Sequence, residues 1–308
     1  MIQTLENSSS ARVQKRQALA ALVGVKPNPT PYVLNCTYHG VAIKFYFESE
    51  SLLTEMKSFL PLNWQNSESF SEKTAMEVFW LKPERFFTSS SWQDDINSDC
   101  EIITSAQAES AIQRDFIGML DVRGFAVVVA NQQIDDGFFN AIRWLLPRRM
   151  LQFKSVLLHS SCIVGHNSLA YFFLGPSGAG KTTVTQMAGD RMVLGDDMNV
   201  LNWGLDGLHA EAGALGQRYS NSSLFSRQFP VGGFFWLRQS PRNFLNPQNN
   251  SKSSIRLLSS CANLFWNQSS AELHQTVLSM IEKVVSIQSI PELEFNFDGG
   301  FWKYVDSN

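Results

Sequence analysis

The sequence has few cysteines and no long apolar run. Its four cysteines, Cys36, Cys100, Cys162 and Cys261, form no C-x-x-C pair, which disfavours a zinc or dithiol redox site. No run of 18 apolar residues is present, so we expect no transmembrane helix. The apolar stretch 18–25 is short and is followed by no small-residue cleavage site, so we expect no secretory signal. These absences predict a cytoplasmic protein with no membrane partner.

The sequence also lacks an excess of basic residues. It has 25 Lys and Arg against 28 Asp and Glu, which gives a formal net charge of −3. Nucleic acids and anionic membranes recruit basic surfaces, so we expect neither as a partner. No internal repeat is evident, which disfavours a solenoid or a propeller. A length of 308 residues suffices for one large or two medium domains.

The first half carries alternating apolar patterns but no chemical motif. Residues 1–30 are typical of a polar tail or an isolated helix, and residues 31–150 predict a mixed α+β domain rich in strands. The predicted elements are a hairpin at 32–36 and 41–47, strands at 76–81 and 124–130, a surface loop at 88–99, and a helix at 135–154 interrupted by Pro147. The pattern assigns no function to this half.

The second half, residues 151–308, has the pattern of an α/β nucleotide-binding domain. A strand at 156–164 precedes a nearly all-apolar strand at 169–174, a glycine-rich loop and a helix from about 181 to 189. Further strands are expected at 191–194, 198–202, 208–211, 232–237 and 293–297, with a long loop at 239–254 and an amphipathic helix at 271–287.

The glycine-rich loop matches the pattern G-x-x-x-x-G-K-[ST] completely. It reads Gly175-Pro176-Ser177-Gly178-Ala179-Gly180-Lys181-Thr182, with Thr183 next. Glycines permit positive φ and a close backbone approach, and successive N–H groups can then point at phosphate oxygens. In this pattern the lysine reaches the β- and γ-phosphates and the threonine hydroxyl binds Mg²⁺. We therefore predict that residues 175–183 bind a nucleoside triphosphate with Mg²⁺.

Two acidic residues, Asp196 and Asp197, lie 15 and 16 residues after Lys181. A helix of about nine residues climbs roughly 14 Å from the loop, and a strand of about five residues returns roughly 16 Å. We expect the strands before the loop and after the helix to be parallel neighbours joined by a right-handed crossover, so that their carboxyl ends lie side by side. One carboxylate would then be directed at Mg²⁺ and the other at the proton of an incoming hydroxyl. We take Thr182 and Asp197 as the metal ligands; the alternative is that the aspartates cap a turn.

Three features together resemble a known family. His159, the loop at 175–183 and the closely following Gly195-Asp196-Asp197 are similar to the C-terminal domain of HPr kinase/phosphorylase and its relatives. The layout also resembles the nucleotide core of ATP-dependent phosphoenolpyruvate carboxykinase. Most P-loop proteins place their second acidic motif much further along the chain. The resemblance covers about residues 150–305, where 229–237 and 290–295 look like later strands of the family.

The resemblance implies an α/β (α+β) fold. Its C-terminal P-loop kinase domain would have a mixed sheet and would follow a smaller, strand-rich α+β domain. It further implies that ATP phosphorylates a serine hydroxyl of a protein or peptide. Lys181 and Thr182 would bind the nucleotide and Mg²⁺, Asp196 or Asp197 would act as the base, and His159 would lie in the active site rather than serve only as a core histidine. Relatives often form rings, so a homo-oligomer is an open alternative.

Two departures leave other functions open. The first 150 residues do not resemble the N-terminal domain of HPr kinases, so HPr is not the expected acceptor. Residues 211–218 are only a weak counterpart of the family's later signature, although Arg218 is a candidate phosphate contact. The alternatives are a kinase for a small metabolite such as free serine, and a nucleotide-binding regulatory or assembly protein with little turnover.

Overall fold

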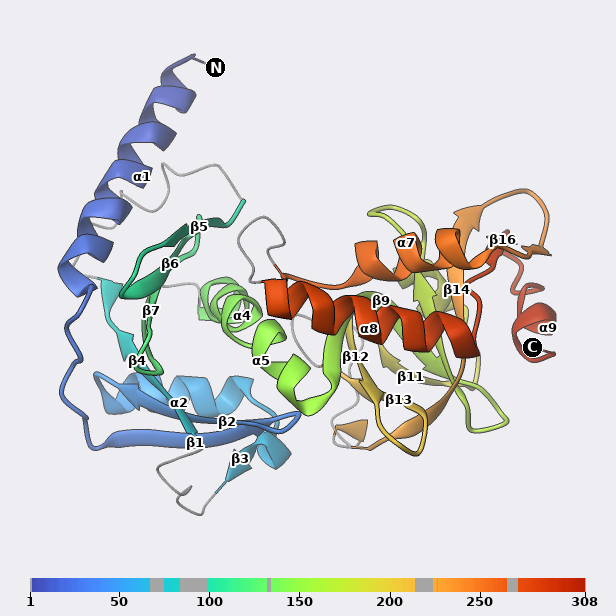
Figure 1. Ribbon diagram of the computed structural model, residues 1–308, viewed down its shortest axis with the longest axis horizontal. Coiled ribbons are helices and arrows are strands. Elements are labelled where there is room, and N and C mark those ends of the chain that lie inside the picture. Colours follow the sequence, from blue (N-terminus) through green and yellow to red (C-terminus); the bar gives the residue numbers. More distant parts are fainter. Residues whose placement is uncertain are drawn as a thin grey trace. The chain divides into compact units, whose positions relative to one another are not determined.

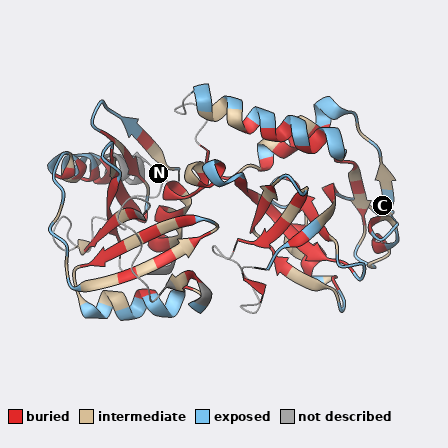
Figure 2. Ribbon diagram, turned by 60° about the horizontal axis from the view of Figure 1, so that its bottom comes forward, coloured by how far each residue is buried: buried red, intermediate tan, exposed pale blue. Residues whose placement is uncertain are grey.

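The computed structural model describes residues 2–66, 75–83, 99–131, 134–213, 224–225, 227–264 and 271–307. The chain divides into two compact units, Met1–Leu146 and Pro147–Asn308, each built on a mixed sheet (Figure 1). In both units buried residues gather along the strands, while helices keep one exposed face (Figure 2). No helix in the described ranges is long and apolar enough to cross a membrane.

Unit 1 is a mixed sheet in the order β3-β1-β2-β4-β8-β7-β6-β5. The pairs β2–β4 and β4–β8 are parallel and the others are antiparallel. The strands are β1 (Tyr32–Tyr38), β2 (Val41–Phe47), β3 (Gln65–Asn66), β4 (Ala75–Leu81), β5 (Glu101–Thr104), β6 (Ala108–Ile112), β7 (Phe116–Asp121) and β8 (Phe125–Ala130). The helices are α1 (Ile2–Leu22), α2 (Glu50–Phe59) and α4 (Ile134–Leu145), with a 3-10 turn at Leu62–Trp64.

The period-two alternation of the strands gives this sheet two apolar faces. Leu19 and Leu22 of α1 pack on the face that carries Tyr46 and Phe79. On the other face, Phe138 of α4 lies 5.5 Å from the Trp80 ring and 6.4 Å from the Phe45 ring. The predicted hairpin is confirmed and closes through a two-residue turn at 39–40 with positive φ. The surface loop expected at 88–99 lies almost wholly outside the described residues.

Unit 2 has a more convoluted sheet, in the order β10-β9-β12-β13-β14-β16-β15, with β11 also paired to β9 and β10 also paired to β14. Its strands are β9 (Ser155–Val164), β10 (Ala170–Leu174), β11 (Met192–Gly195), β12 (Met198–Trp203), β13 (Leu208–Ala212), β14 (Phe229–Gln239), β15 (Phe244–Asn246) and β16 (Glu292–Phe295). Its helices are α5 (Pro147–Met150), α6 (Lys181–Gln186), α7 (Asn250–Ser260), α8 (Ala271–Ile287) and α9 (Trp302–Val305), with a 3-10 turn at Leu151–Phe153.

Helices cover both faces of the unit 2 sheet. Leu257 of α7 and Val277 of α8 pack against the face that carries Phe172 and Phe234. Val184 of α6, together with Trp302 and Val305 of α9, packs against the opposite face, which carries the neighbouring side chains Phe173 and Phe235. Adjacent residues of one strand therefore serve two separate cores, as the alternation of a strand requires.

Two expectations for unit 2 are wrong. The segment 239–254 is not one long loop, because it forms β15 and the first part of α7. The Asn249 side chain caps α7 by accepting the N–H of Lys252 at 2.9 Å. The buried face of this helix includes Ser253, Arg256 and Ser260, so it has no continuous apolar stripe that the sequence pattern could reveal. The helix after the glycine-rich loop also ends earlier than expected, at Gln186.

Candidate functional site

Strand β9 brings the glycine-rich loop and the two aspartates together from its opposite edges. On one edge Ser160 pairs with Leu174, the last residue of β10 before the loop. On the other edge the Ser160 N–H donates to the Asp197 carbonyl at 2.8 Å. The strands β10 and β11 are therefore parallel but not neighbours, which corrects the sequence-based expectation. Because each strand spacing is about 4.8 Å, one intervening strand still leaves the loop and the aspartates within side-chain reach.

The aspartates occupy a break between two strands that follow the same edge of β9. Gly195 of β11 pairs with Cys162, and Met198 of β12 pairs with His159. The two residues between these strands are Asp196 and Asp197. This break places their side chains at the carboxyl end of β10 and not along a regular strand.

The buried Asn199 side chain holds this break in place. Its amide nitrogen donates to the Ser160 carbonyl at 2.7 Å and to the Gly195 carbonyl at 3.3 Å. Asn199 is completely buried, so these hydrogen bonds are shielded from competing water. The Ser160 N–H and the Asn199 bond to the Ser160 carbonyl tie the backbone that carries the aspartates to β9, and the bond from Asn199 to the Gly195 carbonyl links the two ends of the break.

The shape of the glycine-rich loop requires its glycines. Gly178 and Gly180 have φ of +78° and +105°, which side chains rarely allow. A β-carbon on Gly175 would lie 2.7 Å from the Ala179 β-carbon, and one on Gly180 would lie 2.5 Å from Cζ of Phe295. The loop also turns tightly, because the Ala179 N–H donates to the Pro176 carbonyl at 3.1 Å.

Lys181 is buried and its ammonium group faces the loop. Its Nζ donates to the carbonyl of Gly175 at 2.8 Å and to that of Pro176 at 3.1 Å. Burial lowers the pKa of this ammonium group below its ordinary value, and the nearby Asp197 carboxylate partly offsets the shift. A cation solvated by two neutral carbonyls can exchange them for anionic oxygens, which are stronger acceptors.

His159 and Asp197 form a pair on the opposite side of the site. The His159 Nε2 atom lies 3.2 Å from Oδ1 of Asp197, and the two side chains are 42% and 31% exposed. Asp196 is more deeply buried, at 5% exposure. The two neighbouring carboxylates therefore differ in access to solvent, and Asp197 is the one that a large molecule could approach.

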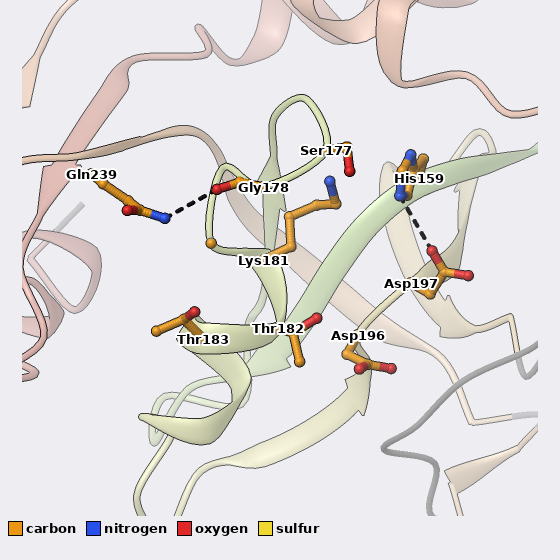
Figure 3. A pocket seen from close by; sticks show the side chains of 10 residues that line it. His159, Ser177, Gly178, Lys181, Thr182, Thr183, Asp196, Asp197 and Gln239 are labelled. Carbon is orange, nitrogen blue, oxygen red and sulfur yellow. Dashed lines mark hydrogen bonds and ion pairs between the residues drawn. The ribbon is translucent and has the colours of Figure 1, made fainter.

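These groups line one cavity of about 420 Å³ (Figure 3). Its walls include Ser177, Gly178, Gly180, Lys181, Thr182, Thr183, Asp196, Asp197, His159 and Gln239. In Figure 3, Lys181 lies between Gln239 on one side and the His159–Asp197 pair on the other. The remaining loop residues predicted for the site, Gly175, Pro176 and Ala179, form the base of the loop and do not line the cavity.

Gln239 is a cavity residue that sequence reasoning missed. It ends β14, which runs parallel to β10, and its amide nitrogen donates to the Gly178 carbonyl at 3.0 Å. Because the carboxyl ends of parallel strands meet at one edge of a sheet, knowing that β14 neighbours β10 would have identified it. The predicted candidate Arg218 lies outside the described residues.

The donor atoms in the cavity suit a loosely held magnesium ion. No group of three or more His, Cys, Asp or Glu side chains in the described part of the chain is placed to hold a metal. Mg²⁺ does not need such a group, because it keeps several waters and takes one or two carboxylates plus substrate phosphates. The Thr182 hydroxyl and the two aspartates meet that requirement.

No protein-family model matches the chain, and no curated protein matches it in sequence.

Proposed function

We propose that the protein is a Mg²⁺- and ATP-dependent kinase, related to HPr kinase/phosphorylase, that phosphorylates a serine hydroxyl of a protein or peptide. The observation that carries this proposal is the composition of one cavity. A phosphate-binding loop with its lysine forms one wall, and a histidine-paired carboxylate forms another. A site that only stored a nucleotide would have no need for the second wall.

The loop supplies the groups that bind the polyphosphate. The first N–H groups of a helix have no partner within that helix, so those of Lys181 and Thr182 are available to phosphate oxygens. The Lys181 ammonium group would leave the carbonyls of Gly175 and Pro176 for the β- and γ-phosphates. Mg²⁺, held by the Thr182 hydroxyl and an aspartate, would neutralise negative charge that develops on the phosphates during transfer.

The two aspartates have different roles in this proposal. The Thr182 hydroxyl and the buried Asp196 would hold Mg²⁺, while the more exposed Asp197 would accept the proton of the acceptor serine. The sequence assigned the metal role to Asp197, and we now give it to Asp196. The reason is that a peptide hydroxyl must reach the base, and Asp197 is the more exposed of the two carboxylates. His159 holds the Asp197 carboxylate in one orientation.

In the proposed transfer, each bond that forms is matched by one that breaks. The serine oxygen forms a bond to the γ-phosphorus as its proton passes to Asp197. The bond between the γ-phosphorus and the bridging oxygen breaks, and its electron pair leaves with ADP. Positioning and electrostatics supply most of the rate in phosphoryl transfer, which fits a site that holds one base and one lysine.

The test is transfer of label from γ-labelled ATP in the presence of Mg²⁺. Three mixtures are compared: the proteins encoded by neighbouring genes, free serine, and no acceptor. Label on serine residues of a polypeptide supports the proposal, and label on free serine supports a metabolite kinase. Tight ATP binding with no transfer in any mixture would refute both kinases and leave a regulatory nucleotide-binding protein.

Variants make the test specific to this site. Lys181→Ala should abolish ATP binding. Asp197→Asn should lower kcat by about 10²- to 10⁴-fold while changing ATP affinity little, because it removes a base and not a phosphate contact. The matched control is Asp190→Asn, since Asp190 pairs with His166 at 3.4 Å on the exposed surface. Equal effects at Asp190 and Asp197 would contradict the assignment.

A further inference from the structure

The residues that line the cavity follow the order of the strands across the sheet. His159 and Asp197 lie at β9 and the strands on its outer edge, and the loop follows β10. Gln239 lies at the end of β14, on the other side of β10. If the γ-phosphate faces Asp197 and the loop holds the phosphates, the nucleoside extends over β14 and its parallel neighbour β16. Ligands of open sheets generally lie over such carboxyl ends.

The segment that follows β16 presents an aromatic ring at this place. Phe295, the last residue of β16, is fully buried, and a β-carbon on Gly180 would meet its ring. Phe297 follows two residues later and is 67% exposed, with its ring centroid 6.2 Å from that of Phe295. Phe297 is therefore separated from the phosphate loop by a single buried ring. Burying apolar surface is favourable, so a flat ligand that covered the exposed part of the Phe297 ring would gain affinity from it.

A polar network fixes the turn that carries Phe297. Asn243 donates to the side chains of Asn296 and Asp298 at 3.0 and 2.9 Å, and its own side-chain oxygen accepts the Asn296 N–H at 2.9 Å. The Gly300 N–H donates to Asp298 at 2.7 Å. These bonds hold both sides of the exposed phenylalanine, so the ring is presented on a rigid turn and loses little entropy when a ligand stacks on it.

We propose that Phe297 is the stacking platform for the nucleobase, with Gln239 marking the boundary between the phosphate and nucleoside parts of the site. This inference rests on the proposed function only in taking a nucleoside triphosphate as the ligand, and it requires no phosphoryl transfer. Stacking on an aromatic side chain contributes through the π-face that every base has. Phe297 thus contributes affinity that a bare polyphosphate cannot gain.

The experiment compares two ligands, ATP and inorganic tripolyphosphate, each with Mg²⁺. Phe297→Ala should raise the Kd for ATP by roughly five- to 150-fold, the range that one lost base stack produces. The Kd for tripolyphosphate should stay unchanged, because that ligand has no base. Phe297→Tyr keeps the aromatic face and should bind ATP as the original chain does. Phe153→Ala removes another half-exposed ring of unit 2 and is the matched control.

Each result of the binding experiment either supports or overturns the proposed stacking on Phe297. An unchanged ATP affinity in Phe297→Ala overturns the platform, and so does an equal loss for both ligands, which would indicate a distorted phosphate loop. A loss in Phe153→Ala as large as in Phe297→Ala also overturns it. ATP binding without any transfer refutes the kinase but leaves the platform standing. If the folded chain binds neither ligand, both the proposed function and the platform fail.

Discussion

Replacing Gly180 by alanine tests whether the loop has the shape described above. Gly180 has φ of +105°, and its absent β-carbon would lie 2.5 Å from Cζ of Phe295. Strain from the left-handed backbone costs about 1–2 kcal/mol. Phe295 is fully buried and cannot move aside easily, so overpacking adds about 1–3 kcal/mol. The expected loss in the free energy of unfolding of unit 2 is therefore about 2–5 kcal/mol, a large share of an ordinary domain's stability.

Gly178→Ala is the matched control for this substitution. Its φ of +78° is also left-handed, but nothing lies within 4 Å of the added β-carbon. Only the strain of about 1–2 kcal/mol should remain. A second control combines Gly180→Ala with Phe295→Leu, whose smaller side chain should relieve part of the collision. The comparison thereby separates backbone strain from steric overlap at the same loop.

Thiol labelling during urea unfolding gives the free energy of each unit separately. Cys162 and Cys261 lie in unit 2, and Cys36 and Cys100 lie in unit 1. Burial raises the pKa of Cys36 and of Cys261 to about 12, so the native thiols react slowly and unfolding exposes them. Labelling of Cys162 should shift to lower urea in Gly180→Ala, while that of Cys36 should not. Equal shifts for Gly178→Ala and Gly180→Ala would refute the proposed contact with Phe295.

Three further predictions concern unit 2. Arg256→Met should lower the free energy of unfolding by about 3–5 kcal/mol, because it removes a buried partner of Glu292 that lies at 2.8 Å. Arg238→Met removes an exposed partner of the same carboxylate and should lower it by under about 1 kcal/mol. Urea unfolding measures both losses. Asn199→Ala should lower the free energy of unfolding by about 1–3 kcal/mol, and it should lower kcat more than ATP affinity because it loosens the turn that carries the aspartates. An unchanged kcat in a folded variant would show that the turn is held by other means. Burial lowers the Lys181 pKa, so above that lowered pKa the unfolded chain binds more protons than the folded one. The Lys181 contribution to the stability of unit 2 should therefore increase as pH rises towards 10.5. The measurement is the urea midpoint of the original chain minus that of Lys181→Met, and this difference should increase over the same pH range.

The local features of the chain were readable in the sequence because they are encoded by neighbouring residues. The strand before the loop, the glycines at 175, 178 and 180 and the hairpin around residues 39–40 all follow from local backbone rules. The mixed α/β character of both units followed from the alternation of apolar patterns. The polar face of α7 escaped the same reasoning because its buried positions hold Ser253, Arg256 and Ser260.

Long-range pairing was beyond these rules. The sequence placed the aspartates near the loop through a direct pairing of β10 with β11, yet β9 lies between them. The same β9 also gives His159 its place opposite Asp197. Gln239 lines the cavity because β14 pairs with β10 on the side away from β9.

The sequence by itself determined that this chain carries a glycine-rich loop of the pattern G-x-x-x-x-G-K-[ST] and a nearby acidic pair, since both depend on residue type and short spacing. The tertiary structure alone decided which strand separates them, which aspartate is exposed and which aromatic ring adjoins the loop. The physical reason is that each of these depends on contacts between segments tens of residues apart. Such contacts form when buried faces match across the whole unit, and no local pattern specifies that match.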